Sequence, residues 1–217
     1  MALAIRGYAP TPPGRTGAQV IVFGTSHQPS YAWSFDRGDG LANVGYGEGL
    51  TAGRSHPTRR ELLSRLDELL PNAAEGATAW RAHHLPLAVP SWPTGRGRVL
   101  LVGDAAGLVN PMTGEGIYYA IATGLLAGRT AAQTTGPGAG RRYREAARGL
   151  LSAHLRHTAL SARLSHSGLI LDAGIRAASA DQRVFDDLVE LGLANGRITA
   201  MTLRGLTRHL ARKPGRI

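Results

Sequence analysis

The sequence predicts an α/β fold, with a mixed sheet in the first part of the chain and a helical tail at its end. Three observations support this prediction. Short apolar runs separated by turn residues fill the first 50 positions. Residues 98–103 form a continuous apolar run, typical of a buried strand, and lead through a glycine-rich loop into a helix at 114–133. After the glycine-rich break at 136–140, apolar residues recur at helical spacing.

The chain accordingly divides into a β-rich region with one helix at 1–95, a strand-loop-helix at 96–135 and a helical region at 136–217. In the first region, residues 2–8, 18–23, 41–47 and 80–87 are predicted strands. Tyr31, Trp33 and Phe35 alternate with small residues, as in a strand with one aromatic face. Asp39-Gly40 is typical of the hairpin turn that would join this strand to the next.

Helices are predicted from their caps and periodicity. Thr58 is the expected N-cap of a helix over 58–70, with Glu61 completing a capping box and Pro71 ending it. The tail should form four helices, at 141–166, 169–179, 181–194 and 199–211.

Composition excludes several classes of function. The 217 residues contain no cysteine, which rules out a disulfide scaffold, a thiolate zinc site and a cysteine nucleophile. No run of about 18 apolar residues could span a bilayer, and residues 1–6 are too short for a signal peptide, so we expect a cytoplasmic protein. We predict no metal site, because the adjacent His83 and His84 would point to opposite faces of a strand, and His154 and His157 share a helix face with no acid.

The net charge of +10 belongs mainly to the tail. Residues 1–140 hold 11 Arg against 9 acids, net +2, whereas residues 141–217 hold 14 Arg plus Lys against 6 acids, net +8. These arginines are spread along helical patterns and are not clustered among stacking aromatics, so we predict no nucleic-acid partner. The basic, leucine-containing tail has two interpretations: a cap packed on the rest of the fold, or a surface that contacts a membrane.

The segment from Gly103 to Ile117 is the candidate binding loop. Asp104 stands at the carboxyl end of the predicted strand, where open sheets present ligands. Unpaired backbone N–H groups at 114–117 and the helix dipole would favour an anionic group. The alternative is a plain strand-to-helix turn with Asp104 as a generic cap. Both interpretations stay open on physical grounds.

The string from Gly103 to Gly116 resembles the second flavin-contact motif of FAD-dependent monooxygenases and reductases of the p-hydroxybenzoate hydroxylase type. Its part Asn110-Pro-Met-Thr-Gly-Glu-Gly-Ile117 is similar to the geranylgeranyl reductase branch. Upstream, Tyr31-Ala-Trp-Ser-Phe35 and Gly45-Tyr-Gly47 resemble the substrate-domain signature of that branch. The signature has proline after the phenylalanine, where this chain has Asp36.

The resemblance implies a partial FAD-dependent oxidoreductase fold, with residues 1–95 from the substrate-binding domain and 96–135 from the FAD-binding domain. It implies hydride transfer from reduced FAD to an isoprenoid C=C bond, with NAD(P)H as electron donor. It does not identify a catalytic residue; an acid such as Glu115 more often complements a helix dipole. The implied FAD-binding residues are Gly103, Asp104, Pro111, Gly114, Glu115, Gly116 and Ile117, and the implied substrate-binding residues are Tyr31, Trp33, Phe35, Gly45 and Gly47.

Members of this family also have a GxGxxG unit that holds the ADP half of FAD, and this sequence contains none. We therefore expect an N-terminally truncated or split form with a partial FAD site, inactive alone unless a separate chain supplies the GxGxxG half. Two alternatives remain. One is an FAD-dependent aromatic monooxygenase, because the flavin motif does not separate the two reactions. The other is an inactive remnant or a fragment that only docks to a partner.

Overall fold

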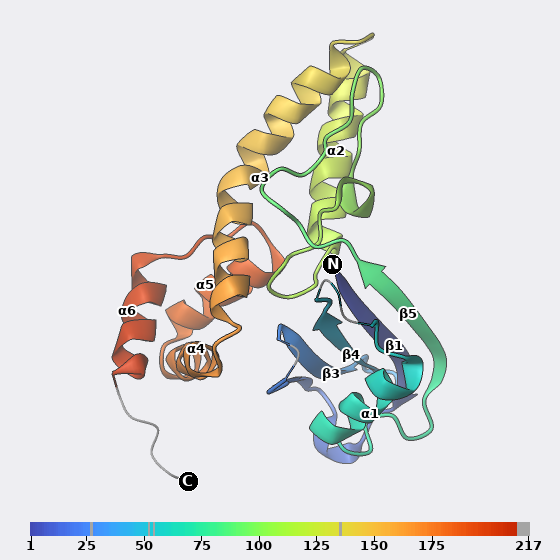
Figure 1. Ribbon diagram of the computed structural model, residues 1–217, viewed down its shortest axis with the longest axis vertical. Coiled ribbons are helices and arrows are strands. Elements are labelled where there is room, and N and C mark those ends of the chain that lie inside the picture. The colour runs from blue at the N-terminus through green and yellow to red at the C-terminus, as the bar shows by residue number, and fades with distance from the viewer. Residues whose placement is uncertain (27, 52, 54, 135, 212–217) are drawn as a thin grey trace. The chain divides into compact units, whose positions relative to one another are not determined.

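A computed structural model describes residues 1–26, 28–51, 53, 55–134 and 136–211 (Figure 1). The chain divides into two compact units, Met1–Leu85 and Pro86–Ile217. The first is a sheet with one α-helix, and the second is built from five α-helices and extended segments in its described residues. The predicted α/β class and helical tail are therefore confirmed. The three-part domain division stays a prediction.

The first unit contains a five-stranded sheet in the order β2-β3-β4-β1-β5. The sequence predicts a mixed sheet, whereas every ladder between these strands is antiparallel. Helix α1 connects β4 to β5, and these two strands are parallel to each other. They do not pair, because β1 lies between them and is antiparallel to both. The strands are β1 (Ala2–Pro10), β2 (Gln19–Phe23), β3 (Ser30–Asp36), β4 (Leu41–Gly49) and β5 (Thr78–Leu85), with a short 3-10 turn η1 (Pro13–Arg15) after β1.

Helix α1 (Arg59–Leu69) covers one face of this sheet (Figure 1). Its predicted capping box is present: the Thr58 hydroxyl accepts from the Glu61 N–H at 3.3 Å, and the Glu61 carboxylate accepts from the Thr58 N–H at 2.6 Å. Leu62 and Leu66 are fully buried and pack in one cluster with Ile5 and other residues of the sheet. The opposite face of the sheet carries the aromatic residues described below.

The second unit packs helices α2 and α3 around a core that includes Trp92, Leu108 and Tyr143. The four predicted tail helices are confirmed to within a few residues of their expected bounds. The helices are α2 (Ile117–Gln133), α3 (Ala139–Leu164), α4 (Gly168–Ala180), α5 (Gln182–Leu193) and α6 (Ala200–Leu210), preceded by a 3-10 turn η2 (Gly103–Ala106).

The predicted buried strand at 98–103 is wrong: no strand is assigned to the described residues of the second unit. Val99 is 62% exposed, and Val102 has an extended but unpaired backbone. A strand needs a neighbour with which to exchange hydrogen bonds. Here the Leu101 N–H instead donates to the Thr94 carbonyl at 3.3 Å, and the Leu101 carbonyl accepts from the Tyr143 hydroxyl at 2.6 Å. The segment is therefore an extended arm held against α3.

Replacing Thr58 with alanine should remove the α1 cap and lower the free energy of unfolding by about 1 kcal/mol. Equilibrium denaturation followed by circular dichroism measures this loss. Ser64→Ala is the matched control, because Ser64 is exposed on the same helix and donates only to Glu68 one turn later. Equal stability of T58A and S64A would contradict the role of the capping box.

Candidate functional site

The loop from Gly103 to Ile117 lies between the extended arm and helix α2 in the second unit. It turns through η2, and the turn ends at Gly107, whose φ of 64° is left-handed. Gly114 is also left-handed, with φ 72°, so helix α2 begins at Ile117 and not at the predicted position 114. Before the helix starts, the loop forms a turn in which Asn110 exchanges backbone hydrogen bonds with Gly114 and Glu115.

The N–H groups predicted to be unpaired at this helix start are largely engaged within the chain, so that prediction is wrong. The Gly114 N–H donates to the Asn110 carbonyl at 2.8 Å. The Glu115 carboxylate accepts from the N–H groups of Ile117 at 2.5 Å and Tyr118 at 3.0 Å. Glu115 thus caps the helix with its own negative charge, while its second carboxylate oxygen is buried without a hydrogen-bond partner in the described structure.

The structure brings Asp104 next to the start of α2. A Cβ atom added to Gly116 would lie 3.4 Å from Oδ1 of Asp104. Gly103 is packed against Ala120, since a Cβ added to it would lie 3.1 Å from the Ala120 Cβ, and its N–H donates to the Thr123 hydroxyl at 3.1 Å. Asp104 is exposed, so its carboxylate is free to accept hydrogen bonds from hydroxyl groups of a ligand.

The remaining loop residues differ in exposure. Pro111 is buried, whereas the Ile117 side chain is 73% exposed. All seven residues implied as FAD-binding thus lie in one loop and the first turn of α2. Whether they contact FAD stays a prediction.

A buried polar network lies next to the loop and is not predicted by any sequence motif. The Tyr119 hydroxyl and His154 Nε2 lie 2.5 Å apart, and both side chains are at most 1% exposed. His154 Nδ1 lies 2.7 Å from the Gly196 carbonyl, which can only accept, so Nδ1 carries the hydrogen and Nε2 accepts from Tyr119. Burial raises the pKa of Tyr119 and lowers the pKa of His154. Only the His154–His157 spacing on one helix pointed to this site.

In the first unit, the aromatic residues of β3 form a ladder on the sheet face opposite α1. Ring centroids lie 5.7 Å apart for Tyr31 and Trp33 and 6.4 Å apart for Trp33 and Phe35. Phe23 on β2 extends the ladder, with its ring 6.2 Å from that of Tyr31. Burial raises the pKa of Tyr31 to about 12, so its hydroxyl stays protonated at neutral pH. The predicted alternation of β3 is confirmed, because Ala32 is fully buried on the opposite face.

Two glycines of β4 lie beside this ladder. Gly45 is opposite Trp33 and Gly47 is opposite Tyr31 in the β3–β4 register. A Cβ added to Gly45 would lie 2.3 Å from a carbon of the Trp33 indole and 2.3 Å from the Ile5 carbonyl oxygen. Gly45 therefore lets the indole lie flat on the sheet, while Trp33 Nε1 donates to the Asn43 side chain at 3.0 Å. The glycines and aromatics together make an apolar surface.

Asp36 takes the place of the signature's proline and organises the adjoining turn. Its carboxylate accepts from the Gly17 N–H at 2.7 Å, from the Thr11 hydroxyl at 2.9 Å and from the Gly38 N–H at 3.3 Å. The hydrogen bond from Gly17, followed by that from Gly38, holds the pKa of Asp36 below its usual value. A side-chain acceptor thus fixes the end of β3 here.

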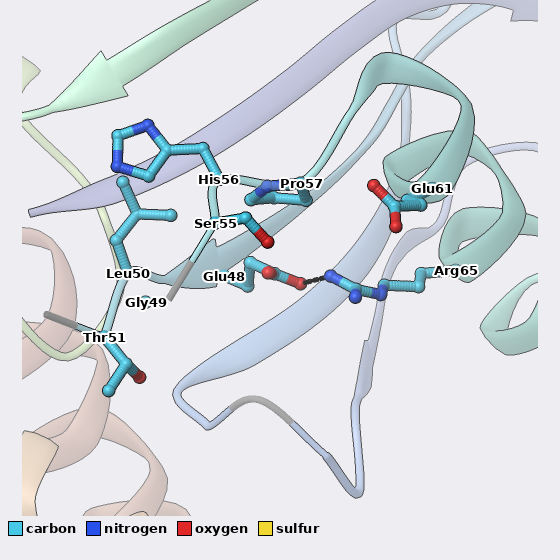
Figure 2. A pocket seen from close by; sticks show the side chains of 9 residues that line it. All are labelled: Glu48, Gly49, Leu50, Thr51, Ser55, His56, Pro57, Glu61 and Arg65. Carbon is cyan, nitrogen blue, oxygen red and sulfur yellow. Dashed lines mark hydrogen bonds and ion pairs between the residues drawn. The ribbon is translucent and has the colours of Figure 1, made fainter. Parts of the chain in front are cut away.

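No sequence motif pointed to a cavity of about 350 Å³ at the start of α1 (Figure 2). Glu48 at its floor is 6% exposed, forms an ion pair with Arg65 and accepts from the Tyr46 hydroxyl at 2.9 Å. The cavity holds two carboxylates, those of Glu48 and Glu61, against one guanidinium. The lining residues are Glu48, Gly49, Leu50, Thr51, Ser55, His56, Pro57, Glu61 and Arg65.

The described residues offer neither a metal site nor a membrane-spanning helix. No group of three or more His, Asp or Glu side chains in that part of the chain is arranged to hold a metal ion. Within the same residues, no helix has both the length and the apolar character needed to cross a membrane.

Replacing Gly45 with alanine should destabilise the first unit by about 1–3 kcal/mol, because the new methyl group overlaps the Trp33 ring and a backbone oxygen. Denaturation followed by tryptophan fluorescence measures the effect. Gly14→Ala is the matched control, since a Cβ there meets nothing within 4 Å and its φ is not left-handed. Stability of G45A equal to that of G14A and of the parent chain would contradict this role of Gly45.

The folded-state pKa of His154 lies below the unfolded value of about 6.5, so its contribution to stability is complete above that pH and is lost as pH falls. We expect unfolding free energy to fall by up to about 1.4 kcal/mol per pH unit below pH 6.5. His154→Gln should reduce this slope, whereas the exposed His166→Gln should preserve it. Denaturant titrations between pH 5 and 7 measure the slopes, and identical slopes in H154Q and the parent would contradict the assignment.

No family model matches the chain. Among curated proteins, it is 37% identical over 112 residues to digeranylgeranylglycerophospholipid reductase 2 of Methanothermobacter thermautotrophicus, covering 51% of this chain and 28% of the relative. It is 35% identical over 150 residues to the menaquinone reductase of Mycolicibacterium smegmatis, covering 58% of this chain and 33% of the relative. The chain thus spans about a third or less of these relatives.

Solved structures match nearly the whole chain. A geranylgeranyl bacteriochlorophyll reductase-like protein from Thermoplasma acidophilum superimposes with a TM-score of 0.60 at 19% identity, over 98% of this chain and 52% of that protein. The R204Q variant of Klebsiella pneumoniae HpxO, solved with FAD, gives 0.54 at 15% identity, over 99% of this chain and 55% of that one. The chain is therefore a homologue of proteins named digeranylgeranylglycerophospholipid reductase and menaquinone reductase, and it has part of the p-hydroxybenzoate hydroxylase-like flavoprotein fold.

Proposed function

We propose that the chain forms part of an FAD-dependent oxidoreductase that reduces isoprenoid C=C bonds. The observation that carries the proposal is the loop from Gly103 to Ile117, in which the free carboxylate of Asp104 lies beside the start of helix α2. The names of the curated relatives, reductases of geranylgeranyl lipids and of menaquinone, support the reaction class.

The loop residues fit FAD in three respects. Asp104 can accept hydrogen bonds from the ribityl or ribose hydroxyls. Gly103 and Gly116 keep the backbone open where a side chain would meet Ala120 or Asp104. The unpartnered buried oxygen of Glu115 is an acceptor that a flavin N–H group could satisfy. When bound, FAD would supply the hydride chemistry, with NAD(P)H as the proposed electron donor.

The protein's own residues would bind and orient the reactants. The ladder of Tyr31, Trp33 and Phe35 offers an apolar surface on which a polyprenyl chain could lie. Binding there would remove apolar surface of both the chain and the rings from water. Gly45 and Gly47 would keep this surface flat.

The proposed FAD site is partial, so we propose that a GxGxxG segment, in the same polypeptide or another, completes it. An apolar stripe on helix α2 suits such a neighbour: Ile117, Ile121 and Leu125 follow one another at four-residue intervals and are 73%, 60% and 58% exposed. Exposed apolar stripes of this kind mark interaction surfaces. Contact of the helical tail with a membrane surface also stays a prediction.

The reaction is tested with the protein complemented by a GxGxxG segment, FAD and NADPH. We expect a geranylgeranyl substrate to lose C=C bonds, detected by mass spectrometry as a gain of two hydrogens per bond. A hydroxylated aromatic product would instead establish a monooxygenase. Absence of any turnover in a complemented, FAD-loaded protein would favour an inactive remnant and contradict the proposal.

Trp33→Ala should raise KM for the isoprenoid substrate about tenfold with little change in kcat, because the indole contributes apolar binding surface and not chemistry. Trp33→Phe is the matched control and should retain most of the affinity. Steady-state kinetics of the complemented enzyme measures both variants. An unchanged KM in W33A would remove the aromatic ladder from the substrate site.

FAD titration of the chain alone, followed by flavin fluorescence, tests the partial site. We expect binding at least about a hundredfold weaker than in the complemented protein, because the pyrophosphate cradle supplies much of the affinity. Equally tight, stoichiometric binding by the chain alone would contradict the proposal that the site is partial.

A further inference from the structure

The loop that carries the proposed flavin contacts is anchored to a distant part of the chain. The Asn110 side chain is fully buried, and its Nδ2 donates to the carbonyls of Leu191 at 3.0 Å and Gly192 at 3.1 Å. Its Oδ1 accepts from the Met112 N–H at 2.9 Å. One side chain therefore shapes the turn of its own loop and binds it to the end of helix α5.

The Thr113 side chain also forms a hydrogen bond with the end of helix α5. Its hydroxyl donates to the Gly192 carbonyl at 2.8 Å. Gly192 is closely packed, since an added Cβ would lie 3.0 Å from Thr113 Cγ2 and 3.6 Å from Met112 Cε. The absence of a side chain at Gly192 allows the loop to approach the helix end.

These contacts suit the chemistry of a helix terminus. Helix α5 ends at Leu193, so the carbonyls of Leu191 and Gly192 are among the last four and have no partner within the helix. The partial negative charge there favours donors such as the Asn110 amide and the Thr113 hydroxyl. The loop thus satisfies the helix end, and the helix end holds the loop.

A further contact fixes the first turn of α2 to the segment that follows α5. Tyr119 donates to His154, and His154 donates to the Gly196 carbonyl, all in buried surroundings. Both ends of the segment from Asn110 to Tyr119 are therefore tied to residues 191–196.

We propose that the carboxyl end of helix α5 positions the 110–117 loop, with Asn110, Thr113 and Gly192 as positioning residues. This inference rests on the proposed function for its link to FAD, but the positioning itself is a property of the chain. It makes the helical tail part of the candidate cofactor site, although none of these tail residues need touch a ligand.

Hydrogen exchange of the backbone amides at 114–118, measured by NMR in the chain without FAD, tests the positioning. Thr113→Val keeps the shape of the side chain and removes the hydroxyl, which donates to Gly192 and also accepts from the Glu115 N–H at 3.4 Å. The amides of residues 114 and 116–118, which do not bind this hydroxyl, should therefore exchange about fivefold to tenfold faster if the tie to α5 positions the loop. Thr113→Ser should restore the parent rates. Gly192→Ala should reproduce the effect of T113V, because its methyl group displaces the threonine.

Thr130→Val is the matched control for a threonine-to-valine change, because Thr130 lies near the far end of helix α2 and its hydroxyl donates to the Leu126 carbonyl of the same helix. It should leave the amides at 114–118 unchanged. Exchange rates at 114–118 in T113V equal to those of the parent would overturn the inference. An increase equal to that of the α3 amides around Leu151 would also overturn it, because it would report only a global loss of stability.

The link to FAD is measured separately in the complemented protein. If the loop holds the flavin, T113V should also shift the visible absorption bands of bound FAD, and T113S should return them. Faster exchange with an unchanged flavin spectrum would uphold the positioning and contradict the proposed location of FAD.

Discussion

The candidate site depends on one constraint: a loop rich in glycine must satisfy its backbone polar groups although, in the described structure, only Val109 pairs with a neighbouring segment, in an isolated bridge to Leu87. Asn110 meets much of this need. Its backbone accepts from Gly114 and donates to the Glu115 carbonyl at 2.7 Å, while its side chain joins the loop to the end of helix α5. Because this residue is fully buried, the loop conformation and the placement of α5 depend on each other.

This dependence explains why the second unit keeps its loop although the expected strand before it is unpaired. Tyr143 and Thr94 take over the hydrogen bonds of Leu101 that a sheet neighbour would supply. The Glu115 carboxylate accepts hydrogen bonds from the N–H groups at the start of α2, where a ligand anion could otherwise bind. Hydrogen-bonding groups within the second unit thus replace those that a paired strand or a ligand would supply. An anionic ligand at the start of α2 would have to displace Glu115.

Local patterns predicted much of the fold. Alternation of Tyr31, Trp33 and Phe35 located β3 and its faces, and Thr58 with Glu61 located the start of α1. The strand at 98–103 was wrong because an apolar run specifies burial and not a pairing partner. The start of α2 was misplaced because the left-handed Gly114 and the Glu115 cap arise from the folded loop. The sequence could not predict the buried hydrogen bonds of Asn110, Tyr119 and His154, because these bonds join positions 35 to 82 residues apart.

The proposed function requires the loop from Gly103 to Ile117 to contact FAD. The most direct measurement is the change of backbone amide chemical shifts when FAD is added to isotopically labelled protein complemented with a GxGxxG segment. If the loop holds FAD, the largest changes will be at Asp104 and at residues 114–118, with the amides of α4 and α6 nearly unchanged. Saturation with FAD that leaves the loop amides unchanged would contradict it.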